Sequence, residues 1–390
     1  MDLYLLVLIL LAGVTLGWVL ARRFGAGRLH ASESPALRDD YFKGINFLLN
    51  EQPDQAIEVF IKLLEVDHQT VETHLALGNL YRRRGEVDRA IRIHQNLVAR
   101  DALSDAQRLE ALLELAQDYL SAGLLDRAED LFVELCEAGA HQVQALRQLI
   151  DIYEQEKDWE KAIRRARELE QVTGNQLGPI IAHYHCEQAA SFRAAGDVPG
   201  ALKMLGQALD AHRGCVRASL LEADVCAETG DYERAVRALQ RVEDQEPAYL
   251  PETIERAQRC YQALARPQDL NAFLTRLMDR YGGISATLEL AEQHNRACGP
   301  QHARDFLTER LSSRTSVRGL DRLLAYELAC ASSQQQGYLP VLKQLTGALL
   351  RDRPVYRCSH CGFPAKTIHW QCPSCKHWNT VKPIQGIEGE

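Results

Sequence analysis

Residues 74–98, HLALGNLYRRRGEVDRAIRIHQNLV, decide the fold of this chain. Gly78, Tyr81, Gly85 and Ala90 lie at the offsets of a tetratricopeptide (TPR) hairpin of two helices. The small residues Gly78 and Ala90 would let the two helices cross closely, and Tyr81 would fill the space beside the crossing. One such hairpin cannot bury its own apolar face, so the stretch predicts a stack of similar units.

The unit recurs along most of the chain. An alanine, replaced once by leucine, returns every 33 to 39 residues at the second-helix position: Ala56, Ala90, Ala128, Ala162, Ala201, Ala235, Leu270 and Ala303. The small first-helix residue twelve positions earlier fails only at Ile150 and Arg259. With a final helical pair added, the pattern predicts an all-α TPR superhelix of about eight or nine hairpins over residues 37–353. Extra residues after Leu97 and around 174–179 predict lengthened turns, where we expect joints between sub-domains.

Stacked hairpins of this kind form a concave surface that can bind a partner. The first-helix residues expected to face inward are Asn79, Arg82 and Arg83 in the second unit, Gln117 in the third, and His183 and Arg193 in the fifth. An asparagine beside two arginines suits the backbone and carboxylates of another protein. These six residues are the candidate partner-binding groove. The alternative is an ordinary solvated face.

The N-terminal segment has the composition of a membrane anchor. Residues 3–21 carry no charge and, as a helix, would extend about 28 Å, enough for the hydrocarbon core of a bilayer. Three arginines follow within seven residues, and positive residues tend to stay on the cytoplasmic side. The sequence predicts a single-pass anchor at residues 1–22, a linker at 23–36 and the bulk of the chain in the cytoplasm.

One face of this predicted membrane helix carries small residues. Gly13, Gly17 and Ala21 recur every four residues, the spacing that lets two membrane helices approach closely. The pattern would support a homodimer. Chance is the alternative, because glycine is common in membrane helices.

Two Cys-x-x-Cys pairs separated by ten residues lie near the C-terminus, at Cys358, Cys361, Cys372 and Cys375. Two such turns facing each other supply four thiolates in a tetrahedron, which suits one structural metal ion, Zn²⁺ or Fe. The pattern predicts a small metal-binding domain and tail at residues 354–390, which we call the knuckle. Four sulfurs complete the coordination shell, so His360, His369 and His377 are expected not to be ligands.

Composition and missing motifs narrow the function further. The net charge of −8 argues against nucleic acid as a partner, because phosphate binding needs clustered lysine and arginine. The other seven cysteines are scattered singly, which is typical of a reducing compartment rather than a disulfide framework. The sequence shows no nucleophile elbow, phosphate loop or HExxH motif. We therefore expect a protein-binding adaptor and not an enzyme.

Together, the membrane segment with trailing arginines, the TPR units and the ending YRCSHCGFPAKTIHWQCPSCKHWNTVKPIQG resemble the lipopolysaccharide assembly protein B family of Gram-negative bacteria. This resemblance implies a rubredoxin-like knuckle packed against the repeats. It also implies an inner-membrane regulator that brings the deacetylase of the lipid A pathway to a membrane-bound AAA protease, alongside other inner-membrane regulators of lipopolysaccharide. Two alternatives stay open. One is an electron-transfer or redox-sensing protein with iron in the cysteine site, and the other is a zinc ribbon that binds nucleic acid.

Overall fold

The computed structural model describes residues 35–50, 52–66, 71–331, 337–351, 353–387 and 389–390. The predicted anchor with Gly13, Gly17 and Ala21, and most of the predicted linker, lie outside these residues. Within the described ranges, no helix has the length and apolarity needed to cross a membrane. The chain divides into two compact units, residues 1–149 and 150–390, and each is described by itself.

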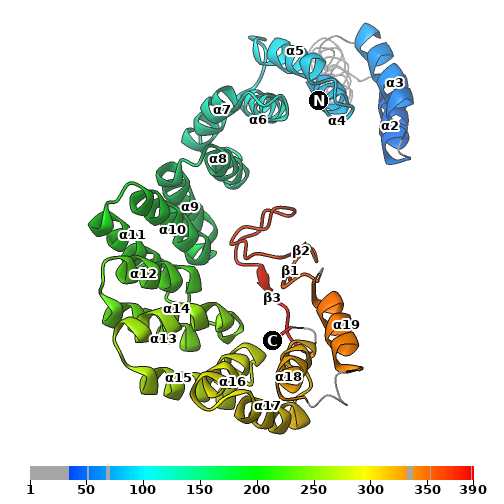
Figure 1. Ribbon diagram of the computed structural model, residues 1–390. Helices are drawn as coiled ribbons and strands as arrows, with labels where there is room; N and C mark the ends of the chain where they lie inside the picture. The colour runs from blue at the N-terminus through cyan, green and yellow to red at the C-terminus, as the bar shows by residue number, and fades with distance from the viewer. Residues whose placement is uncertain (1–34, 51, 67–70, 332–336, 352, 388) are drawn as a thin grey trace, which may run out of the picture. The chain divides into compact units, whose positions relative to one another are not determined.

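Helices of the first unit follow one another as hairpins (Figure 1). The pairs are α2 (Pro35–Leu49) with α3 (Pro53–Val66), α4 (Val71–Arg83) with α5 (Val87–Val98), and α6 (Asp105–Ser121) with α7 (Leu125–Glu137). Helix α8 (Gln142–Glu156) contains the boundary between the two units.

The second unit continues the same pattern. After α9 (Trp159–Thr173) come α10 (Gly178–Ala194) with α11 (Val198–Ala211), α12 (Val216–Glu228) with α13 (Tyr232–Gln245), α14 (Pro251–Ala263) with α15 (Pro267–Tyr281), α16 (Ile284–Cys298) with α17 (Pro300–Ser313), and α18 (Val317–Cys330) with α19 (Leu339–Arg351). A short 3₁₀ turn, Pro247–Tyr249, precedes α14. The knuckle forms a small antiparallel sheet in the order β2-β1-β3, from β1 (Tyr356–Cys358), β2 (Pro364–Ala365) and β3 (Val381–Pro383). The predicted all-helical TPR array with a C-terminal cysteine knuckle is confirmed.

Hairpin turns show where the repeat pattern is kept and where it fails. Gly85 closes the turn after α4 with a φ of 83°, a conformation that favours glycine. The equivalent residues after α8 and α14 are Lys157 (φ 59°) and Ala265 (φ 54°), which adopt the same left-handed conformation with a side chain. These are the two hairpins in which Ile150 and Arg259 already depart from the small-residue pattern. Their turns are therefore held by the stacking of neighbouring repeats rather than by local preference.

The tight crossing predicted at Gly78 is formed with an aromatic ring. A Cβ added to Gly78 would lie 2.3 Å from Nε2 of His94, sixteen residues later on α5. Gly44 meets the ring of Phe60 in the same way, at 2.8 Å and with the same sixteen-residue spacing. The marker alanines are fully buried, as Ala90 is. The glycine thus makes space for a buried ring, and the alanine lets the helices approach.

The boundary between units lies at Leu149 and Ile150, inside α8, and not at either lengthened turn. The joints expected after Leu97 and around residues 174–179 are therefore not where the chain divides. Ile150 occupies the position that most other first helices fill with glycine or alanine.

We expect Gly78→Ala to destabilise the α4–α5 hairpin by about 1–3 kcal/mol, because its Cβ would overlap the buried His94 ring. The control is Gly206→Ala on α11, where an added Cβ meets no atom within 4 Å and should raise stability by up to about 1 kcal/mol. Amide hydrogen exchange of α4 and α11 measures the two local effects separately. Unchanged exchange in α4 would show that the crossing is not tight.

Candidate metal centre

The two Cys-x-x-Cys turns bring four sulfurs together. The Sγ atoms of Cys358, Cys361, Cys372 and Cys375 all lie within 4.8 Å of one another. Two of the separations are 3.8 Å, between Cys358 and Cys375, and 3.7 Å, between Cys361 and Cys372. A tetrahedral ion with metal–sulfur bonds of about 2.3 Å has sulfur–sulfur edges of about 3.8 Å. The four cysteines therefore fit a structural metal ion. Zinc and iron both accept four thiolates in this geometry, so the ligands do not choose between them.

Each cysteine pair is carried by a turn that ends in a left-handed residue, Gly362 (φ 78°) or Lys376 (φ 60°). The Gly362 amide donates to the carbonyl oxygen of Cys358 at 3.0 Å, and the Lys376 amide donates to that of Cys372 at 2.9 Å. Burial alone would raise the pKa of the Cys358 thiol, but its hydrogen bonds with the Thr380 side chain and with backbone amides lower the pKa to about 5. The first turn therefore favours the thiolate at Cys358, which is the form that binds a metal.

Two of the three nearby histidines form a surface pair. The rings of His360 and His377 stack with centroids 3.8 Å apart, and both residues are exposed. With Cys375 they form a second group of ligand-type atoms within 4.8 Å of one another, but this cysteine already belongs to the four-sulfur set. His369 lies against Phe363, with centroids 6.5 Å apart. That the histidines are not ligands stays a prediction.

A single carboxylate connects the knuckle to the repeats. Glu154, near the end of α8, accepts hydrogen bonds from Trp378 Nε1 at 2.9 Å and from Gln371 Nε2 at 2.8 Å. It also accepts one from the hydroxyl of Tyr184 on α10. Burial, together with this carboxylate, raises the pKa of Tyr184, so its hydroxyl remains a donor. Glu154 thus joins α8, α10 and the knuckle.

Aromatic packing surrounds this carboxylate. The ring of His183 stacks on Trp378, with centroids 5.2 Å apart and planes at 23°, and Trp159 meets the same ring edge-on at 6.3 Å. The guanidinium of Arg217 lies 6.0 Å from the Trp378 ring centre. Burial, and then the nearby Arg217 charge, lower the pKa of His183 to about 3, so its imidazole is neutral. The prediction that His183 faces a partner needs correction, because the knuckle covers it.

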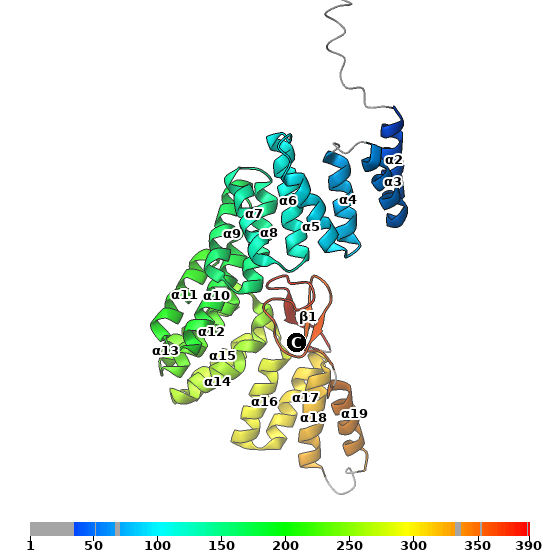
Figure 2. The same ribbon diagram turned by 90° about the horizontal axis from the view of Figure 1, so that it is seen from above.

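The attachment continues along α14 and the turn before it. Tyr249 donates to Oδ1 of Asn379 at 3.1 Å, and Tyr356 donates to the carboxylate of Glu252. These contacts place the sheet on the side of the first helices α10, α12 and α14, as Figures 1 and 2 show. The knuckle therefore occupies the N-terminal part of those helices on that face.

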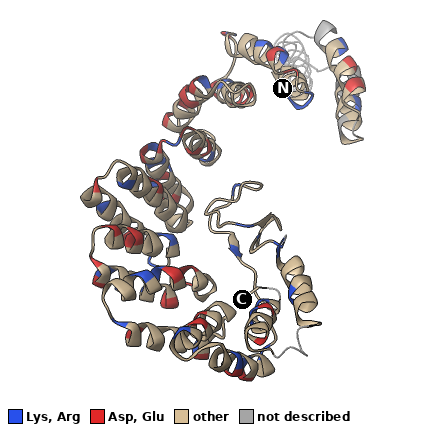
Figure 3. Cartoon of the chain, viewed as in Figure 1, with Lys and Arg blue, Asp and Glu red and all other residues tan. Residues whose placement is uncertain are grey.

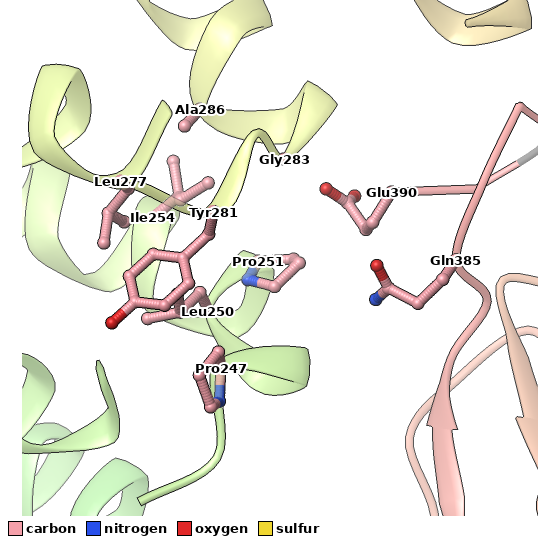
Figure 4. A pocket seen from close by; sticks show the side chains of 10 residues that line it. All are labelled: Pro247, Leu250, Pro251, Ile254, Leu277, Tyr281, Gly283, Ala286, Gln385 and Glu390. Atoms are coloured by element: carbon pink, nitrogen blue, oxygen red, sulfur yellow. The ribbon is translucent and has the colours of Figure 1, made fainter. Parts of the chain in front are cut away.

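Glu390 fixes the end of the tail. Its carboxylate accepts a hydrogen bond from the Ser285 amide at 3.1 Å and pairs with Arg318. Figure 4 shows the small cavity beside it, lined by Pro247, Leu250, Pro251, Ile254, Leu277, Tyr281, Gly283, Ala286, Gln385 and Glu390. Its volume is about 40 Å³, which has room for only a few waters. The cavity marks the seam between tail and repeats rather than a ligand pocket.

Arg82, a predicted groove residue of the first unit, is used inside the fold. Its guanidinium lies 2.6 Å from Glu114 and 2.7 Å from Asp118, both on α6. Asp118 is fully buried and also lies 2.5 Å from Nδ1 of His94. A buried carboxylate requires a compensating cation, and Arg82 supplies it, so Arg82 has a role within the fold; that it also binds a partner stays a prediction.

The neighbouring groove residues divide between this network and solvent. Asn79 and Gln117 accept hydrogen bonds from Arg82 at 2.8 Å and 3.0 Å, so both belong to the same cluster. Arg83 is exposed. Of the four candidates in the first unit, Arg83 keeps an exposed side chain.

Arg193 lies beside an open hollow of about 410 Å³ in the second unit. Residues at the C-terminal ends of α10, α12 and α14 line much of this hollow. Arg193 pairs with Glu228, and Arg256 pairs with Asp224 at 2.8 Å. Arg259, which breaks the repeat consensus, is exposed there. In the second unit, knuckle residues cover His183 but do not line this charged hollow beside Arg193.

Family models match both the repeats and the knuckle. A model of the rubredoxin metal binding domain matches residues 356–383, and TPR models match 73–106, 113–172 and 192–252. The chain is 39% identical over 386 residues to lipopolysaccharide assembly protein B of Escherichia coli strain K12, covering 99% of both chains. This chain belongs to the lipopolysaccharide assembly protein B family. A second family member, from Haemophilus influenzae, is 33% identical over 393 residues, covering 98% of this chain and 99% of that protein. Among solved structures, a tetratricopeptide repeat protein from Parabacteroides merdae gives a TM-score of 0.35 at 14% identity, over 62% of this chain and 92% of that one.

Several site residues of this family member carry no recognisable motif. Glu154, Tyr249 and Glu390 are an ordinary glutamate, tyrosine and tail residue in the sequence. The sequence signal that could have indicated a docking site is the pair Trp370 and Trp378, because a metal domain of this size cannot bury two tryptophans by itself. That signal indicates a docking surface but does not say which repeat provides it.

We expect Cys372→Ser to release the metal and to separate the knuckle from the repeats, because the small sheet has too little apolar area to fold without it. Metal content and the fluorescence of Trp370 and Trp378 measure the loss, while circular dichroism should show that the helices remain. Cys298→Ser, at an exposed cysteine of α16, is the control and should change neither quantity. Full metal content in Cys372→Ser would contradict the assignment.

We expect Arg82→Ala to destabilise the first unit by about 2–4 kcal/mol, because Asp118 would stay buried without its guanidinium partner. Arg83→Ala removes the same charge from an exposed position and should change stability by no more than about 0.5 kcal/mol. Hydrogen exchange of α4 and α6 distinguishes the two variants. Equal effects would mean that Arg82 is not structural.

Proposed function

We propose that this protein is an adaptor of the inner membrane that regulates lipopolysaccharide synthesis. In this proposal it brings the deacetylase of the lipid A pathway to a membrane-bound AAA protease, which degrades the enzyme. The observation that carries the proposal is the 39% identity, over 99% of both chains, to a protein named lipopolysaccharide assembly protein B. The N-terminal apolar run supplies the proposed anchor, with the bulk of the chain on the cytoplasmic side.

The architecture supports binding rather than catalysis. TPR hairpins give an extended surface for protein partners, and the charged hollow beside Arg193 is open to such a partner. The metal in this proposal is structural, because the knuckle is fixed to the repeats through Glu154, Trp378 and Tyr249. Electron transfer through an iron site is not favoured, because the relatives are named for lipopolysaccharide assembly.

A reconstituted degradation assay tests the adaptor role directly. The full chain, the AAA protease and the deacetylase are placed together in lipid nanodiscs, and loss of the deacetylase is followed over time. We expect the chain to accelerate degradation, and an unrelated substrate of the same protease to be degraded at its usual rate. No acceleration, with all three proteins folded, would contradict the adaptor role.

Deleting residues 1–22 tests the role of the predicted anchor. We expect the truncated chain to keep its helices and metal but to lose regulation in cells, because tethering raises the local concentration near membrane partners. The matched control replaces residues 1–22 with an unrelated single-pass helix of the same orientation, which should restore regulation. The half-life of the deacetylase in cells is the measurement. Full regulation by the truncated chain at native expression would show that tethering is not required.

A further inference from the structure

Helix α19, the last helix of the array, exposes a stripe of large apolar side chains. Val341, Leu342, Leu345 and Leu349 of α19, with Tyr338 in the turn just before the helix, are each between 43% and 58% exposed. Their spacing of three or four residues places them along one side of the helix. Leu339 and Thr346, on a different side, are buried, and α19 packs on α18. The helix thus has one face against the array and a second apolar face that the described residues leave exposed.

The chain segment that carries this stripe is rich in basic residues. From residue 338 to residue 357 the sequence has four basic residues and one acidic residue, in a chain whose net charge is −8. Arg351 and Arg357 are exposed, while Lys343 is paired with Asp321 of α18. In Figure 3 no part of α19 has the red of Asp and Glu, in agreement with its sequence LPVLKQLTGALLR. An apolar stripe with basic neighbours matches an amphipathic helix that lies at the surface of an anionic bilayer.

The size and charge of the stripe argue against a second copy of the chain as the partner that covers it. Five half-exposed large side chains present on the order of 400 Å², the size of the largest patch that single proteins tolerate and about half of what each partner buries in a stable complex. A twofold contact would also bring two positively charged segments together. A lipid surface needs no complementary shape, and its anionic head groups attract the arginines.

We propose that α19 docks on the membrane surface, with the stripe at Val341, Leu345 and Leu349 entering the interface of anionic phospholipids. This inference rests on the proposed function in one respect, because the N-terminal anchor would hold the helix near the bilayer. The contact would be a second attachment of the chain to the membrane, about 320 residues after the anchor. It would orient the second unit, and with it the hollow beside Arg193, relative to the lipid.

Hydrogen exchange of the full chain in nanodiscs tests the proposal. One set of nanodiscs contains phosphatidylcholine alone, and the other contains a mixture of phosphatidylcholine and phosphatidylglycerol. We expect the amides of α19 to exchange severalfold more slowly with phosphatidylglycerol, and high salt to weaken the difference. Equal exchange of α19 in the two lipids would overturn the proposal.

Two double variants test whether the lipid-dependent protection requires the stripe or any exposed apolar residue. Leu345→Glu with Leu349→Glu places two negative charges in the stripe and should abolish the lipid-dependent protection. The control, Val172→Glu with Phe192→Glu, changes two exposed apolar residues of the same unit and should retain it. Unchanged exchange in α10 and α12 verifies that each variant is folded. Protection that depends on protein concentration instead of lipid charge would overturn the proposal in favour of a second copy or another protein.

A failure of the proposed N-terminal anchor can be told apart from a failure of α19 docking. If the full chain does not enter nanodiscs at all, the anchor of the proposed function has failed. The same protein is then mixed with preformed vesicles of the two compositions. Sedimentation with the phosphatidylglycerol vesicles alone, lost in the Leu345→Glu, Leu349→Glu variant, would still support docking of α19. No sedimentation with either vesicle would overturn it.

Discussion

The position of the knuckle on the repeats depends on the carboxylate of Glu154. It accepts from Trp378 and Gln371 of the knuckle and from Tyr184 of the repeats. Glu154 is half-buried, and these donors replace part of the water that an exposed carboxylate would bind. The knuckle, in turn, has three short strands and cannot bury its tryptophans alone. Within the second unit, the repeats thus supply an acceptor for the knuckle, and the knuckle supplies donors for Glu154.

The metal turns determine whether Glu154 finds its donors. Gln371 directly precedes Cys372, and Trp378 follows Cys375 by three residues. The two donors face each other in an isolated antiparallel bridge beside the second cysteine turn. A metal ion that fixes this turn therefore also fixes the two hydrogen bonds to α8. The metal turn and the contact with α8 are therefore parts of one local structure.

Arginines link successive first helices across the repeats. Arg82 reaches Asp118, Arg193 reaches Glu228, and Arg256 reaches back to Asp224, each pair being 32 to 36 residues apart. Removing one partner of such a pair lowers stability most where the other partner is buried, as Asp118 is. The loss is small where both partners are exposed. An arginine on a concave TPR face is therefore not automatically a ligand for a partner. The charged hollow and the stripe on α19 remain as surfaces that internal contacts do not fully use.

The sequence by itself determined the features that arise from local spacing. The glycine and alanine period gave the TPR hairpins, because helix crossings need small residues at fixed offsets, and two Cys-x-x-Cys turns gave the metal centre, because four thiolates must converge on one ion. Only the tertiary structure decided how these parts meet. Periodicity says which face of a helix points inward but not what lies opposite, so it could not show that the knuckle covers His183 or that Asp118 uses Arg82. Contacts between residues more than two hundred positions apart, such as Glu154 with Trp378, leave no repeat or motif in the chain.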